Sequence, residues 1–182
     1  MLEVLAKPET REMIYRFSKA EYHRLAEGQR TELIQGVIFQ KMSKSPLHAN
    51  FLQLLLDLIR PLVPVDYHLV VEKPLDLVDS EPGPDLAITP RIRSMHDPHP
   101  STAYLVAEIS VMTAAYDEAK ADVYAEALVP LYWQILLLEK TTVVYSEPQG
   151  GKYQSVIRVP FETALTVDLR GQKLSVPLGE IR

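Results

Sequence analysis

The stretch Tyr104-Leu105-Val106-Ala107-Glu108-Ile109 decides how this chain folds. Its apolar residues follow one another without polar alternation, which is typical of a strand covered on both faces of a sheet. Glu108 interrupts the run near its end. A carboxylate with such neighbours is costly to bury unless it is paired or ligated. The stretch therefore predicts a central strand whose one acidic residue needs a partner.

The chain after this strand predicts one long helix and several more strands. Residues 113–128 are rich in Ala, Glu and Lys, which favour a helix, and Thr113 is the expected N-cap. Residues 131–138 predict a second buried strand. Residues 141–146 and 153–159 predict a hairpin around Gln149-Gly150-Gly151, and residues 165–181 predict one or two short strands.

The chain before this strand predicts two helices and four strands. Ser18 and Glu21 form a capping box for a helix that ends at Gly28, and Ser45-Pro46 opens a helix that ends near 61–64. Four strands are expected at 31–34 and 37–42, on either side of the Gln35-Gly36 turn, and at 67–72 and 85–89. The whole order predicts an α/β fold, with a mixed sheet flanked by helices.

Composition limits the class of protein. A chain of 182 residues is long enough to form one domain, here 1–182, with its own core. It has no cysteine, which excludes disulfides and thiolate metal sites and fits a reducing cytosol. Residues 1–10 lack the apolar core of a signal peptide, and the apolar stretch 51–65 is interrupted by charges and a proline. We expect a soluble, cytoplasmic protein.

The net charge of −5 argues against a large nucleic-acid footprint, which normally appears as a basic surface. It does not exclude a nuclease, because carboxylates that bind Mg²⁺ are acidic until the metal arrives.

Three acidic residues lie where predicted strands begin or end. Asp85 follows Pro84, Glu108 ends the central strand, and Glu32 opens the first hairpin. Two carboxylates brought close together repel each other, and a divalent cation with oxygen ligands resolves the conflict. The simpler interpretation of Asp85 alone is a solvated carboxylate at the start of a strand.

Lys120 could complete such a site by orienting water and offsetting phosphate charge. It lies on the predicted 113–128 helix, with Asp117 and Tyr124 on neighbouring turns. The simpler interpretation is an exposed helix lysine paired with Asp117 or Glu126.

Other candidates have simpler explanations. His96, Asp97 and His99 could form a metal cluster, but prolines surround them and a solvated loop is the favoured interpretation. Tyr132 and Trp133 enter a buried strand, so core packing is favoured over base stacking.

Short motifs in a fixed order connect these observations, over about residues 22–145. They are Glu32-Leu33-Ile34-Gln35-Gly36, Met42-Ser43, His48, Pro84-Asp85-Leu86, Val106-Ala107-Glu108-Ile109, Tyr116-Asp117, Lys120, Tyr124-Ala125-Glu126-Ala127, Val129-Pro130 and Tyr132-Trp133. In these motifs the chain resembles the Uma2 family (DUF820), itself similar to the PD-(D/E)XK nucleases. Residues 146–182 would add C-terminal strands.

The resemblance implies a restriction-endonuclease-like fold and a metal-dependent endonuclease acting on DNA. Asp85 and Glu108 would bind Mg²⁺, with Mn²⁺ as a substitute, and Lys120 would be the lysine of the site. Glu32 would be an auxiliary acid and His48 would line the site. A homodimer is plausible, because cutting two strands needs two sites.

The chain departs from the family pattern at a few positions. The spacing from Asp117 to Lys120 is one residue shorter than expected, and one residue is about 100° of helix rotation. Leu128 stands where a glycine is common, and Val111-Met112 where small polar residues are usual. Two alternatives therefore stay open, a catalytically inactive binding or assembly module and a metal-dependent hydrolase of another phosphoester.

Overall fold

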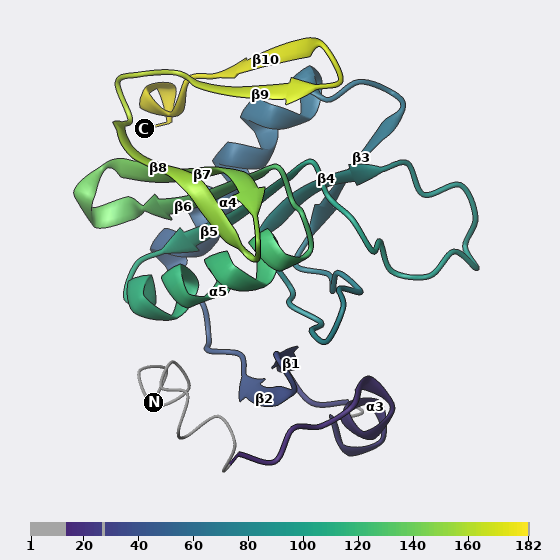
Figure 1. Cartoon of the computed structure of the whole chain (residues 1–182). Helices are drawn as coiled ribbons and strands as arrows, with labels where there is room; N and C mark the ends of the chain where they lie inside the picture. Colours follow the sequence, from purple (N-terminus) through teal and green to yellow (C-terminus); the bar gives the residue numbers. More distant parts are fainter. Residues whose placement is uncertain (1–13, 27, 182) are drawn as a thin grey trace.

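The computed structural model describes residues 14–26 and 28–181, so the expectation for residues 1–10 lies outside the described residues. Its centre is a six-stranded mixed sheet in the order β3-β4-β5-β6-β7-β8 (Figure 1). The bounds are β3 Tyr67–Val71, β4 Leu86–Pro90, β5 Leu105–Ser110, β6 Leu131–Leu136, β7 Thr141–Gln149 and β8 Lys152–Pro160. Only β5 and β6 pair in parallel, because helix α5 (Ala114–Glu126) connects them. The predicted fold class is confirmed.

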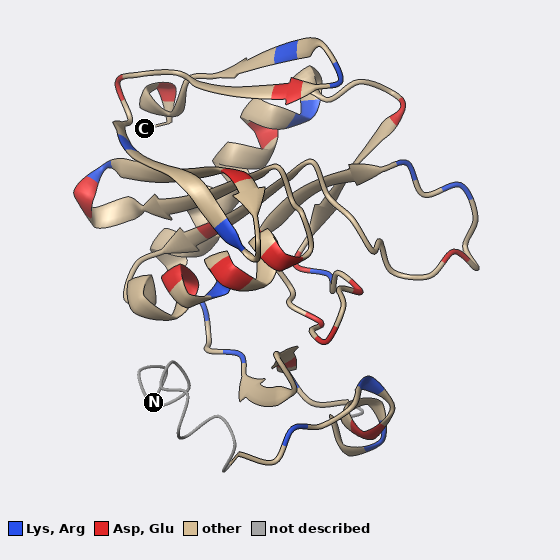
Figure 2. Cartoon of the chain, viewed as in Figure 1, with Lys and Arg blue, Asp and Glu red and all other residues tan. Residues whose placement is uncertain are grey.

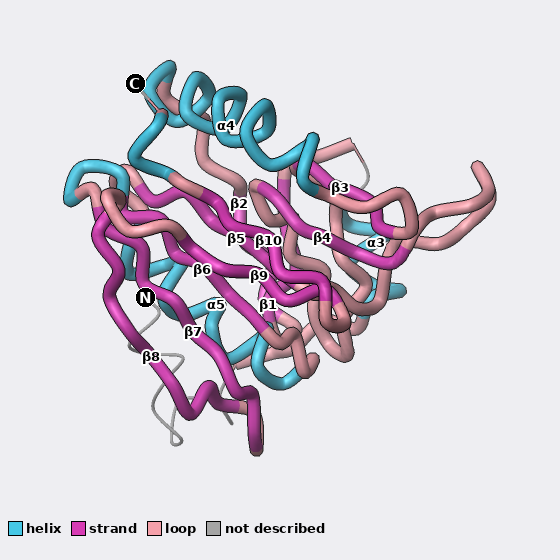
Figure 3. Tube along the Cα trace, turned by 90° about the horizontal axis from the view of Figure 1, so that it is seen from above, coloured by secondary structure: helices cyan, strands magenta, loops and turns pink. Residues whose placement is uncertain are grey.

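Two helices cover the two faces of the sheet. Helix α4 (Pro46–Ile59) lies on one face and α5 on the other, as Figure 3 shows from above. Side chains of β5 alternate between the faces: Leu105 and Ala107 pack in the cluster of α4, and Val106 packs in the cluster of α5. Every residue of β5 is buried, as its continuous apolar run predicts. By the same alternation, Glu108 faces α5.

Smaller elements flank this core. The hairpin of β1 (Thr31–Ile34) and β2 (Val37–Gln40) and the helix α3 (Lys19–Ala26) lie below the sheet in Figure 1. The hairpin of β9 (Leu165–Leu169) and β10 (Gln172–Val176) packs on the α4 side. Within residues 14–26 and 28–181, 3₁₀ turns lie at Arg60–Leu62, Leu137–Glu139 and Leu178–Glu180.

Local signals in the sequence fix several element ends. Glu21 accepts hydrogen bonds from the backbone N–H and the hydroxyl of Ser18, at 2.8 and 2.7 Å, which confirms the capping box. Ser45 accepts from the N–H of His48 at 3.2 Å and caps α4. Thr113 is the N-cap residue of α5, as predicted, but its side chain makes no cap hydrogen bond and donates to the Asp117 carboxylate instead.

Two turns contain residues with left-handed backbone. Gln35 (φ 48°) and Gly36 (φ 77°) both lie in the left-handed region, as a tight type I′ turn requires. Leu128 (φ 55°) also has left-handed backbone just after α5. A residue there pays a steric cost that glycine avoids, which explains why glycine is common at this position.

Across the described residues, no helix combines the length and the apolar character needed to cross a membrane.

Candidate active site

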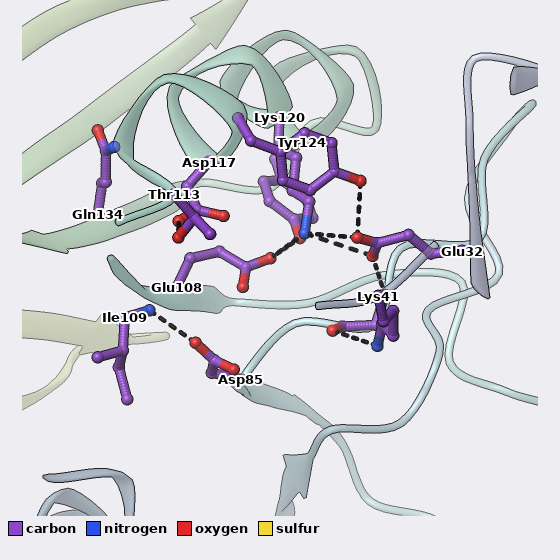
Figure 4. A network of polar contacts seen from close by, with 12 residues as sticks. Glu32, Lys41, Asp85, Glu108, Ile109, Thr113, Asp117, Lys120, Tyr124 and Gln134 are labelled. Carbon is purple, nitrogen blue, oxygen red and sulfur yellow. Dashed lines mark hydrogen bonds and ion pairs between the residues drawn. The ribbon is translucent and has the colours of Figure 1, made fainter. Parts of the chain in front are cut away.

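The register of two strands brings the candidate carboxylates together. In the antiparallel pair β4 and β5, Leu86 lies opposite Ala107, so Asp85, one residue earlier, comes opposite Glu108. The backbone N–H of Ile109 donates to Oδ2 of Asp85 at 2.7 Å and ties the start of β4 to the end of β5. Figure 4 shows the two side chains on these neighbouring strands.

Asp85 is a buried carboxylate with its own cations. It is 5% exposed, which excludes the simpler interpretation of a solvated carboxylate at the start of a strand. Nζ of Lys44 pairs with its Oδ1, and Nε2 of His48 lies 2.9 Å from its Oδ2. Burial alone would raise the pKa of Asp85, but the hydrogen bond from His48 and the charge of Lys44 outweigh it and lower the pKa to about 2.

Glu108 is as buried as Asp85 but has a different partner set. Its Oε1 accepts from Nζ of Lys120 at 3.0 Å and from the hydroxyl of Tyr124 at 2.8 Å. Burial raises the pKa of Glu108 to about 8; the Lys120 ammonium opposes this, and the negative charge of Asp85 adds to it. Glu108 is therefore the carboxylate whose charge is least compensated.

Lys120 is shared between two acids. It is 3% exposed and pairs with Glu32 and Glu108, which excludes the simpler interpretation of an exposed lysine paired with Asp117 or Glu126. Its Nζ lies 3.1 Å from Oε1 of Glu32, which also accepts from the hydroxyl of Tyr116 at 2.7 Å. Burial works against the charge of Glu32, yet Lys120 and the hydrogen bond from Tyr116 hold its pKa below the ordinary value.

The ion-pair distances and the pKa directions disagree on which acid Lys120 neutralises. The two distances are nearly equal, at 3.1 and 3.0 Å to Glu32 and Glu108. Glu32 has the additional donors, the Tyr116 hydroxyl and the backbone N–H of Gly83 at 3.0 Å, so we assign the charge to Glu32. The lowered pKa of Glu32 and the raised pKa of Glu108 agree with this assignment.

Asp117 points away from Lys120. Its Oδ2 accepts from the hydroxyl of Ser110 at 2.7 Å and from that of Thr113 at 2.5 Å. Lys120 contacts Glu108, whereas Asp117 faces the start of α5. Ser110, two residues after Glu108 on β5, donates its hydroxyl hydrogen bond to Asp117.

Sequence reasoning missed three side chains of the site, those of Tyr116, Lys44 and Glu72. Tyr116 lies four residues before Lys120, as Tyr124 lies four after it, so helical spacing could have placed both on the Lys120 face. Lys44 and Glu72, which pair with each other beside Asp85, gave no such signal, because both lie in irregular backbone.

The other predicted candidates are not part of this cluster. His96, Asp97 and His99 are exposed loop residues, as favoured from the sequence. Tyr132 and Trp133 are fully buried core residues. Two surface hollows of about 330 and 210 Å³ lie near the loop that follows β4, at the far end of that strand from Asp85.

The donor set fits a hard divalent cation. Four acids are buried here: Lys44 pairs with Asp85, Lys120 pairs with Glu32 and Glu108, and Asp117 has hydroxyl donors and no paired lysine. This excess of negative charge, made of oxygen donors, suits Mg²⁺ or Mn²⁺. Among the described residues, no group of three or more His, Asp or Glu side chains is arranged to hold a metal ion; Mg²⁺ commonly binds through one or two carboxylates and keeps several waters.

Comparisons with known proteins agree with this description. A search of curated proteins finds no match. Among solved structures, the chain is similar to a crystal structure from Anabaena variabilis ATCC 29413, described as "a putative nuclease belonging to DUF820", with a TM-score of 0.69 and 17% identity. The similarity covers 90% of this chain and 96% of that chain, which establishes the shared fold. A family model described as "Putative restriction endonuclease" matches residues 20–178, and the chain therefore belongs to the Uma2 family.

Proposed function

We propose that this protein is a metal-dependent endonuclease that hydrolyses phosphodiester bonds in DNA, with Mg²⁺ as its metal and Mn²⁺ as a substitute. The observation that carries the proposal is the placement of Asp85 opposite Glu108, beside the buried ammonium of Lys120. Asp85 and Glu108 would hold the metal. A bound Mg²⁺ would stabilise charge on the transferring phosphate and make water a better nucleophile.

The remaining side chains hold this arrangement in place. Glu32 and the Tyr116 ring, 4.8 Å from Nζ of Lys120, fix the ammonium so that it can stabilise negative charge on a phosphate oxygen. His48 and the Ile109 N–H hold Oδ2 of Asp85 and leave Oδ1 toward Lys44. Such fixed charges act without reorganisation during the reaction.

DNA is proposed as the substrate because the family description names a restriction endonuclease. The distribution of charged residues gives weaker support for a DNA substrate. Figure 2 shows lysines and arginines on separate segments and acidic residues along α5. We therefore expect a small footprint centred on the metal, with weak dependence of binding on salt. A symmetric dimer would supply the two sites that a double-strand cut needs.

The test combines metal titration and a plasmid-nicking assay on the same samples. Isothermal titration of Mg²⁺ and Mn²⁺ is compared between the wild type, Asp85→Asn, Glu108→Gln and the control Asp57→Asn, an exposed acid on α4. We expect the first two variants to lose metal binding and to nick at least about a hundredfold more slowly. The control should match the wild type.

The other outcomes identify the alternatives. Metal binding without DNA cleavage would show that the substrate is wrong and would favour another phosphoester. A wild type that binds no metal, with or without DNA, would overturn the proposal in favour of an inactive binding or assembly module.

A further inference from the structure

The segment between β2 and α4 brings two lysines to the start of β4. Residues 41–45 have no regular secondary structure. Nζ of Lys41 donates to the carbonyl oxygen of Gly83 at 2.9 Å. Nζ of Lys44 forms ion pairs with Oδ1 of Asp85 and with Oε1 of Glu72. The two lysines differ in their partners: Lys44 forms an ion pair with Asp85, whereas Lys41 acts only through its charge, which helps to lower the pKa of Glu32.

The two oxygens of Asp85 have separate partners. Oδ2 accepts from the Ile109 N–H at 2.7 Å and lies 2.9 Å from Nε2 of His48. Oδ1 is paired with Lys44. Oδ2 is held by one residue of β5 and one residue of α4. Oδ1 is therefore the oxygen available to a metal. An ammonium and a divalent cation repel each other strongly at such short range, so they cannot share Oδ1.

We infer that Lys44 is an internal competitor for the metal, occupying Oδ1 of Asp85 in the metal-free protein and leaving it when the cation binds. This inference rests on the proposed function, because a metal held by Asp85 is its premise. Lys44 thereby sets how tightly the site binds its metal, and it prevents Asp85 from standing uncompensated when the metal is absent.

Exposure shows which of the two cations can move. The Lys120 side chain is 4% exposed and is held between Glu32 and Glu108. The Lys44 side chain is 29% exposed, and its second partner, Glu72, is 47% exposed. Lys44 can therefore move away from Asp85 and keep its ion pair with Glu72 at the edge of the site. This movement needs only one flexible side chain on an irregular segment.

The experiment measures Mn²⁺ affinity by calorimetry, with the metal alone as the probe. Lys44→Met removes the competing charge and keeps the aliphatic chain, and we expect it to bind Mn²⁺ about tenfold more tightly than the wild type. Lys41→Met is the matched control, because it removes the same charge from the same segment without touching Asp85. Lys44→Arg keeps a cation at position 44. Lys41→Met and Lys44→Arg should both bind Mn²⁺ with an affinity near that of the wild type.

A second readout does not depend on activity. Metal-free Lys44→Met should melt at a lower temperature than the wild type, because Asp85 loses a partner. Saturating Mn²⁺ should raise the Tm of Lys44→Met by more than it raises the Tm of the wild type. Lys44→Gln should give the same direction and serves if the methionine variant folds poorly. Equal or weaker affinity in both neutral variants would overturn the role of Lys44 and leave the proposed function intact. Absence of binding in the wild type and in every variant would overturn both.

Discussion

Asp85 and Glu108 are opposite each other on neighbouring strands, yet their environments differ sharply. Both are almost fully buried, at 5% and 4% exposure, so burial does not separate them. Asp85 pairs with Lys44 and His48, and its pKa falls to about 2. Glu108 shares its one cation with Glu32, and its pKa rises to about 8. Partners, and not depth, therefore decide which carboxylate is ionised.

The comparison assigns a different role to each half of the candidate site. Asp85 already pairs with Lys44 and His48, so the proposed metal would have to displace Lys44 from its Oδ1. Glu108 shares one ammonium with Glu32, so the proposed metal would supply positive charge that it lacks.

The largest effect is expected for Lys120→Met. It leaves Glu32 and Glu108 buried without a cation, and breaking a buried pair in this way costs about 3–5 kcal/mol of unfolding free energy. Urea unfolding of the metal-free protein measures it. Lys152→Met is the control, since Lys152 pairs with Asp122 on the surface and should change little. A loss for Lys120→Met as small as that of the control would mean that neither acid depends on Lys120.

The next effect compares the two carboxylates directly. Asp85→Asn removes the charge that holds Lys44 and His48, and should cost about 2–4 kcal/mol in metal-free protein. Glu108→Gln keeps an oxygen acceptor for Lys120 and Tyr124 and should cost less than about 1 kcal/mol. Chemical denaturation of both variants at neutral pH checks the ranking. The reverse order would contradict the assignment of Lys120 to Glu32.

The sequence predicted the fold well because its signals are local or periodic. The buried run around Glu108, the Ser18–Glu21 capping box and the Gln149-Gly150-Gly151 turn each indicate an element without long-range information. The structure contains these elements, and the order of helices and strands agrees with the prediction. Residues that begin, end or bury a helix or strand can therefore be identified from the sequence alone.

The site was only partly predictable because its contacts are long-range. The family motifs placed Asp85, Glu108 and Lys120 in one site, and the structure brings them together. No pattern connects Lys44 with Asp85, which lies 41 residues away along the chain. That contact depends on how an irregular segment packs against the start of β4. The functions of all these residues stay predictions until metal binding is measured.

The last effect is the pH dependence of stability that the comparison predicts for metal-free protein, which is read as a small change in slope. Glu108 has a pKa of about 8 in the folded protein and an ordinary value of 4.5, so between these values only the folded state retains the proton. The unfolding free energy should therefore fall as the pH rises through this window, by at most about 1.4 kcal/mol per pH unit. Asp85 shifts the other way, from 3.8 to about 2, so its stabilisation is complete above its ordinary value and is lost only as the pH falls toward 2.

The difference between wild type and Glu108→Gln isolates this contribution, because every other ionisable group is the same in both proteins. Urea unfolding at about pH 5.5, 6.5 and 7.5 should give a steeper decline for the wild type than for the variant. Parallel slopes would show that Glu108 is ionised throughout. The two carboxylates would then be alike, Lys120 would belong to Glu108, and Glu32 would be the acid left without a cation.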